Sequence, residues 1–200
     1  MLYYERKFSK LGRDIIIGVD EAGRGPLAGP VVAAAVYLKT FNFLNRIDDS
    51  KKLSSFQRLK SFHELVEKSV FGIGVVSEAV IDRINILTAT QCAMEQAVGN
   101  LLRRLPKIEE SRIHLLVDGP TAFSCSFPIT CIINGDAKSK SIAAASIVAK
   151  TIRDRIMDIY DKILPAYGFK QHKGYATQCH RQAIAVWGLS FFHRKSFCCV

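Results

Sequence analysis

The strongest constraint on the fold comes from a run of β-branched residues that ends in two carboxylates. Residues 15–19 have the composition of a buried strand, and Asp20 and Glu21 follow them directly. A loop rich in glycine and proline, residues 23–30, leads into a second apolar run at 31–38. The pattern predicts two strands joined by a loop whose backbone a ligand can approach closely, because glycine has no side chain to block it.

Strand-like and helix-like segments alternate along the rest of the chain. Short apolar runs predict strands, and apolar residues at helical spacing predict helices that end at prolines or begin at capping serines. The predicted strands cover residues 71–77, 113–117 and 128–133, and the predicted helices cover about 55–68, 84–105, 139–164 and 176–187. Strands interleaved with helices are typical of an α/β protein with a central mixed β-sheet flanked by helices.

The length of 200 residues fits one domain, and we expect residues 1–200 to form it. No internal repeat, Ser/Pro-rich linker or block of charge divides the chain. The strongest break in the pattern lies at residues 165–168. Residues 165–200 are therefore expected to form a helical extension of the same domain.

The chain is strongly basic, with 28 Lys and Arg against 18 Asp and Glu and a net charge of +10. Such a charge favours a polyanionic partner such as nucleic acid, although a solvated basic surface accounts for the same count. No stretch approaches the ~20 consecutive apolar residues of a membrane helix, and the N-terminus lacks the apolar core of a signal peptide. We expect a cytoplasmic protein with no membrane contact.

Carboxylates follow two of the predicted strands. Asp20 and Glu21 close the first strand, and Asp118 closes the strand at 113–117. Ligands of open α/β sheets gather beyond the carboxyl ends of the strands, so these side chains are expected to converge. Asp136, in an Asn-Gly-Asp turn, is placed to join them. The alternative is that each aspartate only forms a turn or caps a helix.

A converging group of carboxylates points to a metal site. Hard oxygen donors without Cys or His suit Mg²⁺ or Mn²⁺, and carboxylates brought together without a cation would repel one another. Metal ions can hold a phosphate between such carboxylates while Lys and Arg hold the flanking backbone of a nucleic acid. The pattern therefore predicts hydrolysis of a phosphodiester.

Several motifs resemble those of bacterial ribonuclease HII, the type 2 ribonuclease H. The longest is Gly18-Val19-Asp20-Glu21-Ala22-Gly23-Arg24-Gly25-Pro26-Leu27-Ala28-Gly29-Pro30-Val31-Val32. Others follow in the family's order over nearly the whole chain: Asp49-Ser50-Lys51-Lys52-Leu53, Asn85-Ile86-Leu87, Val117-Asp118-Gly119, Gly135-Asp136, Ala143-Ala144-Ala145-Ser146-Ile147-Val148-Ala149-Lys150, Arg153-Asp154, Gln171-His172-Lys173-Gly174-Tyr175 and His193-Arg194-Lys195-Ser196-Phe197. The related ribonuclease HIII changes the loop at 23–25 and normally adds an N-terminal domain, so type HII is expected.

The resemblance implies a ribonuclease H-like fold with a C-terminal helical extension. It implies an endonuclease that cleaves the RNA strand of RNA–DNA hybrids. It also implies incision on the 5′ side of single ribonucleotides in duplex DNA, leaving a 3′-hydroxyl and a 5′-phosphate. Such an enzyme would remove ribonucleotides and RNA primers from DNA. The implied partners are RNA–DNA hybrid and ribonucleotide-containing duplex DNA, and a monomer is expected.

The family's four acidic positions, which hold the divalent metal, fall on Asp20, Glu21, Asp118 and Asp136. Asp154 is a rival for the fourth place because it also matches an acid of the family pattern. It lies within the predicted helix 139–164, where an ion pair or a solvated face is the favoured interpretation, so Asp136 is preferred.

The remaining candidates are residues for holding the nucleic acid. Gly23, Arg24 and Gly25 resemble the family loop that contacts the ribose 2′-hydroxyl through backbone groups, and Tyr175 resembles the tyrosine that stacks on the following deoxyribose. Hydroxyl and ammonium groups are expected to hold phosphate at Ser50, Lys51, Lys52, Ser146 and Lys150. The alternatives are a tight turn for the loop, a half-buried packing role for Tyr175 and a solvated surface for each lysine.

Competing functions remain open from the sequence. They are a DNA-directed strand-transfer or junction-cleaving enzyme on the same fold, a ribonuclease without a junction preference, and a binding module for hybrids that has no catalytic activity. The intact carboxylates argue against the binding module.

Overall fold

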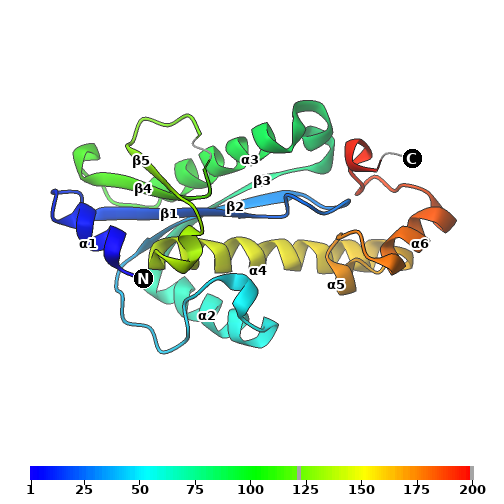
Figure 1. Ribbon diagram of the computed structural model, residues 1–200, viewed down its shortest axis with the longest axis horizontal. Helices are drawn as coiled ribbons and strands as arrows, with labels where there is room; N and C mark the ends of the chain where they lie inside the picture. The colour runs from blue at the N-terminus through cyan, green and yellow to red at the C-terminus, as the bar shows by residue number, and fades with distance from the viewer. Residues whose placement is uncertain (121–122, 199–200) are drawn as a thin grey trace.

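Five strands form one mixed β-sheet at the centre of the molecule (Figure 1). The computed structural model describes residues 1–120 and 123–198. The strands are β1 (Ile15–Ala22), β2 (Val31–Leu38), β3 (Ser69–Val76), β4 (Ile113–Asp118) and β5 (Ile129–Ile132). Their order across the sheet is β3-β2-β1-β4-β5. β1 is antiparallel to β2 and parallel to β4, β2 is antiparallel to β3, and β4 is parallel to β5, which confirms the predicted mixed sheet.

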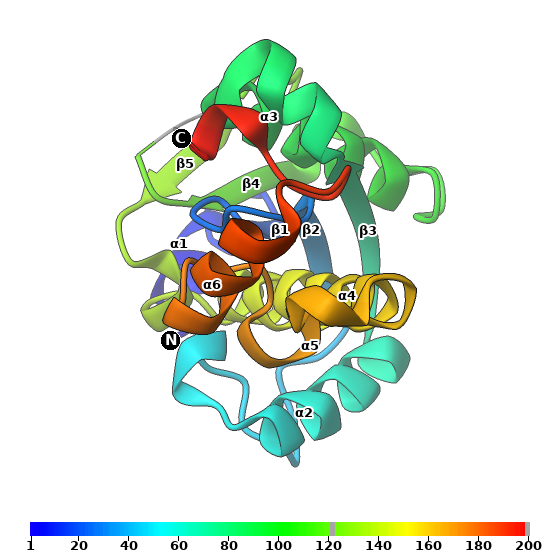
Figure 2. The ribbon, with the colours of Figure 1, turned by 90° about the vertical axis from the view of Figure 1, so that its right-hand side faces the viewer.

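Helices cover both faces of the sheet (Figure 2). α3 (Glu78–Leu102) packs on one face, and α4 (Lys140–Ile163) and α2 (Ser55–Lys68) lie on the other. Alternate residues of a strand point to opposite faces, so Ile17 joins the core beneath α3 whereas Gly18 faces α4. A Cβ at Gly18 would lie 2.1 Å from the backbone carbon of Ser141, so β1 and α4 touch through their backbones.

Two predicted helices agree closely with the structure and one differs at its start. Ser54 and Gln57 form a capping box at the start of α2, and Ser139 caps α4. α3 begins at Glu78 rather than at 84, and its backbone breaks at Asn85, which has φ 63°. Asn85 also has ψ 167°, so its backbone is not helical and two helical pieces meet there; the predicted start at 84 lies at this break.

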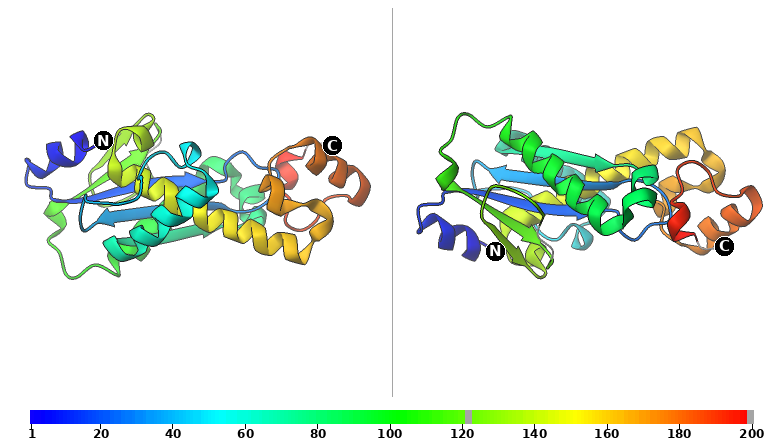
Figure 3. Two further views of the ribbon diagram at one scale, coloured as in Figure 1. Left: turned by 90° about the horizontal axis from the view of Figure 1, so that it is seen from below. Right: turned by 90° about the horizontal axis from the view of Figure 1, so that it is seen from above.

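Short elements occupy the two ends of the molecule (Figure 3). α1 (Tyr3–Ser9), which the sequence pattern did not predict, lies at one end, where Phe8 stacks on His114. α5 (Phe169–His172) and α6 (Gln178–Trp187) lie at the other end, where Phe169 packs with Met157 of α4. The 3-10 segments are η1 (Ser50–Lys52), η2 (Glu110–Arg112), η3 (Gly135–Ala137), η4 (Pro165–Tyr167) and η5 (Lys195–Phe197). The helical extension predicted for residues 165–200 is present as far as residue 198.

Within residues 1–120 and 123–198, no helix combines the length and the apolar character needed to cross a bilayer.

Candidate active site

The parallel pairing of β1 with β4 brings two of the predicted carboxylates together. The pairing register places Val19 opposite Val117, so Asp20 and Asp118 come next on neighbouring parallel strands, Asp118 as the last residue of β4 and Asp20 two residues before the end of β1. Both side chains line a cavity of about 210 Å³. Its lining consists of Asp20, Glu21, Ala22, Gly23, Arg24, Gly25, Ser50, Lys51, Asp118, Ser146, Lys150 and Tyr175. All the candidate residues except Lys52 and Asp136 therefore line one cavity.

Asp20 is the most deeply buried carboxylate of this cavity, with 5% of its surface exposed. Its Oδ1 accepts a hydrogen bond of 2.7 Å from the backbone N–H of Glu21. Burial raises the pKa of Asp20 well above its ordinary value, and the charges of Glu21 and Asp118 raise it further. The site therefore opposes a negative charge at Asp20 unless a cation balances it.

The two neighbouring carboxylates are held by different partners. Glu21 accepts from the Arg24 guanidinium at 3.4 Å, and burial raises the pKa of Glu21 even though Arg24 lowers it. Asp118 Oδ1 accepts a hydrogen bond of 2.6 Å from the backbone N–H of Gly135, at the start of η3. This bond ties the end of β4 to the segment that carries Asp136.

Asp136 is buried in η3, beside the cavity rather than in its lining. Its pKa is raised by burial, then by the charges of Asp49 and Asp118. Asp49 was not among the predicted site residues, although it opens the Asp-Ser-Lys-Lys-Leu motif, which was the available signal. Its side chain accepts from the backbone N–H of Lys51 at 2.9 Å and so caps η1. The acidic group thus extends from Asp20 to Asp49.

Asp154, the rival of Asp136, lies in α4 and forms ion pairs with two cations. Its carboxylate is 3.2 Å from the Arg58 guanidinium and 2.6 Å from the Lys150 ammonium. These contacts agree with the ion-pair interpretation of its sequence position. Asp154 is absent from the lining of the cavity, and its charge is already balanced.

The predicted phosphate-holding residues separate into two groups. Ser50 and Ser146 are buried at the cavity and their hydroxyls hydrogen-bond to each other at 2.8 Å. Lys51 and Lys150 line the same cavity, and burial lowers the pKa of Lys150. Lys52 instead lies 3.8 Å from Asp48 in an exposed ion pair. The cavity therefore combines carboxylates with cationic side chains.

The glycine loop and Tyr175 also line the cavity. Gly23 has φ 99°, a conformation that glycine adopts without strain. Tyr175 is 46% exposed, and its ring has the Lys150 ammonium 6.0 Å from its centroid. The Arg153 guanidinium carbon also lies 6.0 Å from this centroid, so the ring is partly exposed with two cations beside it.

The donor set fits a hard divalent cation, because the gathered side chains are carboxylates and the pKa values of three of them are raised by burial and mutual repulsion. Among the described residues, no three His, Cys, Asp or Glu side chains are already drawn together as a complete metal cluster. Glu21 is turned toward Arg24 instead.

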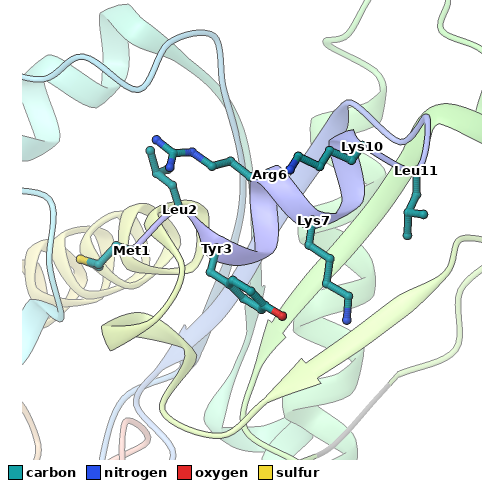
Figure 4. Close-up of a pocket in the computed structure, with 7 residues that line it drawn as sticks. All are labelled: Met1, Leu2, Tyr3, Arg6, Lys7, Lys10 and Leu11. Atoms are coloured by element: carbon teal, nitrogen blue, oxygen red, sulfur yellow. The ribbon is translucent and has the colours of Figure 1, made fainter.

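A larger cavity of about 690 Å³ lies beside α1, lined by Met1, Leu2, Tyr3, Arg6, Lys7, Lys10 and Leu11 (Figure 4). These side chains are apolar or basic, and Figure 4 shows the basic ones spread apart rather than directed at one point. This cavity is larger, but its lining contains no carboxylate and no converging polar groups that could catalyse hydrolysis.

Comparison with known proteins decides the family. The model of the family described as ribonuclease HII matches residues 17–200. The chain belongs to the ribonuclease HII family. It is 49% identical over 198 residues to ribonuclease HII of Acetivibrio thermocellus, a match that covers 98% of this chain and 75% of the relative. This family consists of nucleases of the ribonuclease H type, as the sequence motifs predicted.

Solved structures show the same fold. Ribonuclease HII in its complex with PCNA from Archaeoglobus fulgidus has a TM-score of 0.72 and 25% identity, covering 90% of this chain and 93% of that chain. Bst ribonuclease HIII in complex with Mn²⁺ has a TM-score of 0.66 and 17% identity, covering 90% of this chain and 72% of that chain. The five-stranded mixed sheet with its flanking helices and C-terminal extension is therefore a ribonuclease H-like α/β fold, as predicted.

Proposed function

We propose that the protein is an endoribonuclease that hydrolyses the RNA strand of RNA–DNA hybrids. The observation that carries this proposal is the cavity in which Asp20 and Asp118, on neighbouring parallel strands, meet the Gly23–Gly25 loop. The carboxylates can bind metal ions, and the loop backbone beside them can approach a ribose. This combination is what hydrolysis of RNA requires. Membership of the ribonuclease HII family supports the same substrate class.

The finer specificity that we propose is incision on the 5′ side of a single ribonucleotide embedded in duplex DNA. The products would be a 3′-hydroxyl and a 5′-phosphate. Backbone groups at Gly23, Arg24 and Gly25 would contact the 2′-hydroxyl, and Tyr175 would stack on the deoxyribose that follows. A half-exposed ring in the same cavity as this loop supports the assignment. Removal of ribonucleotides and RNA primers from DNA is the corresponding role.

Asp20, Glu21, Asp118 and Asp136 are the residues that would hold the metal. Mg²⁺ and Mn²⁺ both suit four carboxylates, and the solved ribonuclease HIII of the same fold holds Mn²⁺. Two bound ions would supply activation of the attacking water and stabilisation of the leaving 3′-oxygen. Raised pKa values of Asp20 and Glu21 support the assignment, because carboxylates under mutual repulsion gain most from a cation.

The remaining residues of the cavity would hold and orient the substrate. Lys51 and Lys150 would bind phosphates, since both residues line the same cavity as the carboxylates. The hydrogen bond between Ser50 and Ser146 joins η1 to α4 and so fixes the position of Lys51. Exposed Lys52, paired with Asp48, would contact phosphate farther along the duplex. We further propose that one domain acts as a cytoplasmic monomer.

A cleavage assay with three duplexes tests the proposal. The duplexes are all-DNA, DNA with one embedded ribonucleotide, and a continuous RNA–DNA hybrid, each supplied with Mg²⁺ or Mn²⁺. We expect cleavage of the second and third duplexes, no cleavage of the first, and a 3′-hydroxyl product end. Cleavage of the all-DNA duplex would favour a DNA-directed nuclease, and cleavage of the hybrid alone would remove the proposed junction specificity.

A further inference from the structure

Two fully buried arginines lie behind the glycine loop. Arg153 of α4 and Arg194, just before η5, both have 0% of their surface exposed. Within the described residues neither forms a salt bridge within 4 Å of a carboxylate. A buried charge is costly unless its hydrogen bonds are satisfied. The hydrogen-bond partners of the two guanidinium groups therefore indicate the structural role of these arginines.

Arg194 donates all its hydrogen bonds to the loop that follows β1. Its guanidinium contacts the backbone carbonyl oxygens of Gly23 at 2.6 Å, Arg24 at 2.9 Å and Gly29 at 2.6 Å. Both ends of the loop are therefore attached to one planar group. The backbone N–H of Arg194 also donates to Leu27 O at 2.8 Å.

Arg153 joins the same loop to the turn that carries Tyr175. It donates to the carbonyl oxygens of Ala28 and Pro30, each at 3.0 Å, and to that of Lys173 at 2.9 Å. Directly beside this bridge, Leu27 N–H donates to Gly174 O at 2.9 Å. One guanidinium therefore connects the loop with the turn two residues before Tyr175.

Glu78 is an acidic residue that interacts electrostatically with both arginines. It is buried at the start of α3, and burial raises its pKa whereas the charges of Arg194 and Arg153 lower it. Because the guanidinium hydrogen bonds go to carbonyl groups and not to Glu78, they hold the backbone rather than an ion pair. A planar fork with five donors suits this task better than an ammonium group does.

We propose that Arg153 and Arg194 are positioning residues that set the distance between the Gly23–Gly25 loop and the Tyr175 ring. This proposal rests on the proposed function, in which these two segments contact consecutive sugars. The ligand class is a ribonucleotide followed by a deoxyribonucleotide, and a fixed spacing between the segments favours that step over continuous RNA. The two arginines thus act on the choice of substrate through the backbone and touch no reacting atom.

A glycine substitution tests the spacing without altering a buried charge. A Cβ at Gly174 would lie 2.3 Å from Ala28 O, so Gly174→Ala forces the turn and the loop apart. Gly188→Ala is the matched control, because Gly188 also has a positive φ, of 74°, but a Cβ there meets nothing within 4 Å. Both variants bear the strain of a positive φ, and only the first one changes the spacing.

The measured quantity is the ratio of kcat/KM on one embedded ribonucleotide to kcat/KM on a continuous hybrid. Gly174→Ala should lower this ratio by about 10-fold or more, since misplacement by about 1 Å costs up to 10²-fold. Gly188→Ala should keep the parent ratio. If both variants keep that ratio, or both lower it equally, the positioning role is wrong.

Arginine variants provide the second test. Arg153→Lys and Arg194→Lys keep the charge opposite Glu78 but lose the planar fork, and both should lower the same ratio. Leu101→Ala, on the buried face of α3, is the control for lost stability, and it should lower the melting temperature without changing the ratio. Lysine variants with the parent ratio would overturn the proposal. A parent enzyme that does not cleave at the embedded ribonucleotide would instead overturn the proposed junction specificity.

Discussion

The molecule buries charge in two adjoining regions, and it does so in opposite ways. In the acidic region formed by Asp20, Glu21 and Asp118, the pKa of Asp20 is raised by burial and by the charges of the other two carboxylates. Behind the glycine loop, Arg153 and Arg194 are buried just as deeply, but backbone carbonyl groups accept their hydrogen bonds. The carboxylates of the first region repel one another and are suited to binding a cation. The arginines of the second region have their hydrogen bonds satisfied and are suited to fixing the backbone conformation of the loop.

The largest expected effect on the cleavage rate comes from removing one charge of the acidic region. Asp20→Asn or Asp118→Asn should lower kcat by about 10²-fold or more, because each removes a charged metal ligand. The melting temperature of Asp20→Asn should not fall, since the substitution also removes repulsion. Cleavage rates and thermal unfolding measure the two effects, and Asp14→Asn, in an exposed pair with Arg112, is the control. Near-normal activity of both site variants would contradict the metal assignment.

The next effect lies at the junction of the two regions, on the ring of Tyr175. Tyr175→Ala should slow cleavage at an embedded ribonucleotide by roughly 5- to 150-fold, because stacking is worth about 1–3 kcal/mol. Tyr175→Phe should retain most of the rate, since stacking does not need the hydroxyl. Rates of both variants on the same duplex give the comparison. If the alanine variant is stable and as fast as the parent, Tyr175 only packs.

The sequence predicted the acidic region far better than the arginine region. The β-branched run before Asp20 and the similar run before Asp118 indicated two strand ends, and the family motifs supplied Asp136 and the glycine loop. Arg153 and Arg194 stand in two of the family motifs, but no role was predicted for them, because nothing local distinguishes a buried arginine from an exposed one. Apart from Lys173, which is 20 positions from Arg153, their partners lie 123 or more positions away, so only the folded chain reveals them.

His193, next to Arg194 in the chain, and Asp20 are expected to make the free energy of unfolding depend on pH in opposite directions. Burial and the neighbouring His180 lower the pKa of His193 to about 4. The unfolded chain, with an ordinary pKa of 6.5, then binds the proton first, so His193 contributes stability that is lost as the pH falls from 6.5 through about 4. Asp20 has the opposite sign, because its raised pKa makes the folded state bind the proton first as the pH falls.

Thermal unfolding between pH 7.5 and 4 measures both contributions. His193→Gln should lose less stability than the parent on acidification, by up to about 3 kcal/mol if the full shift is realised. Asp20→Asn should lose more than the parent over the same range. Parallel curves for His193→Gln and the parent would show that burial of His193 does not contribute to the acid sensitivity of the C-terminal region.

The smallest expected effect concerns the exposed cations of the cavity, which differ from the buried arginines in facing the solvent. Each phosphate contact contributes a slope of about 0.9 in log affinity per log unit of salt, so Lys51→Ala should reduce the slope for hybrid binding by about that amount. Lys10→Ala, directly after α1 and in a cavity separate from that of Lys51, should leave it unchanged. Both are measured in an Asp20→Asn background, in which cleavage is expected to be slower by about 10²-fold or more. Equal slopes for all three proteins would place Lys51 outside the substrate interface.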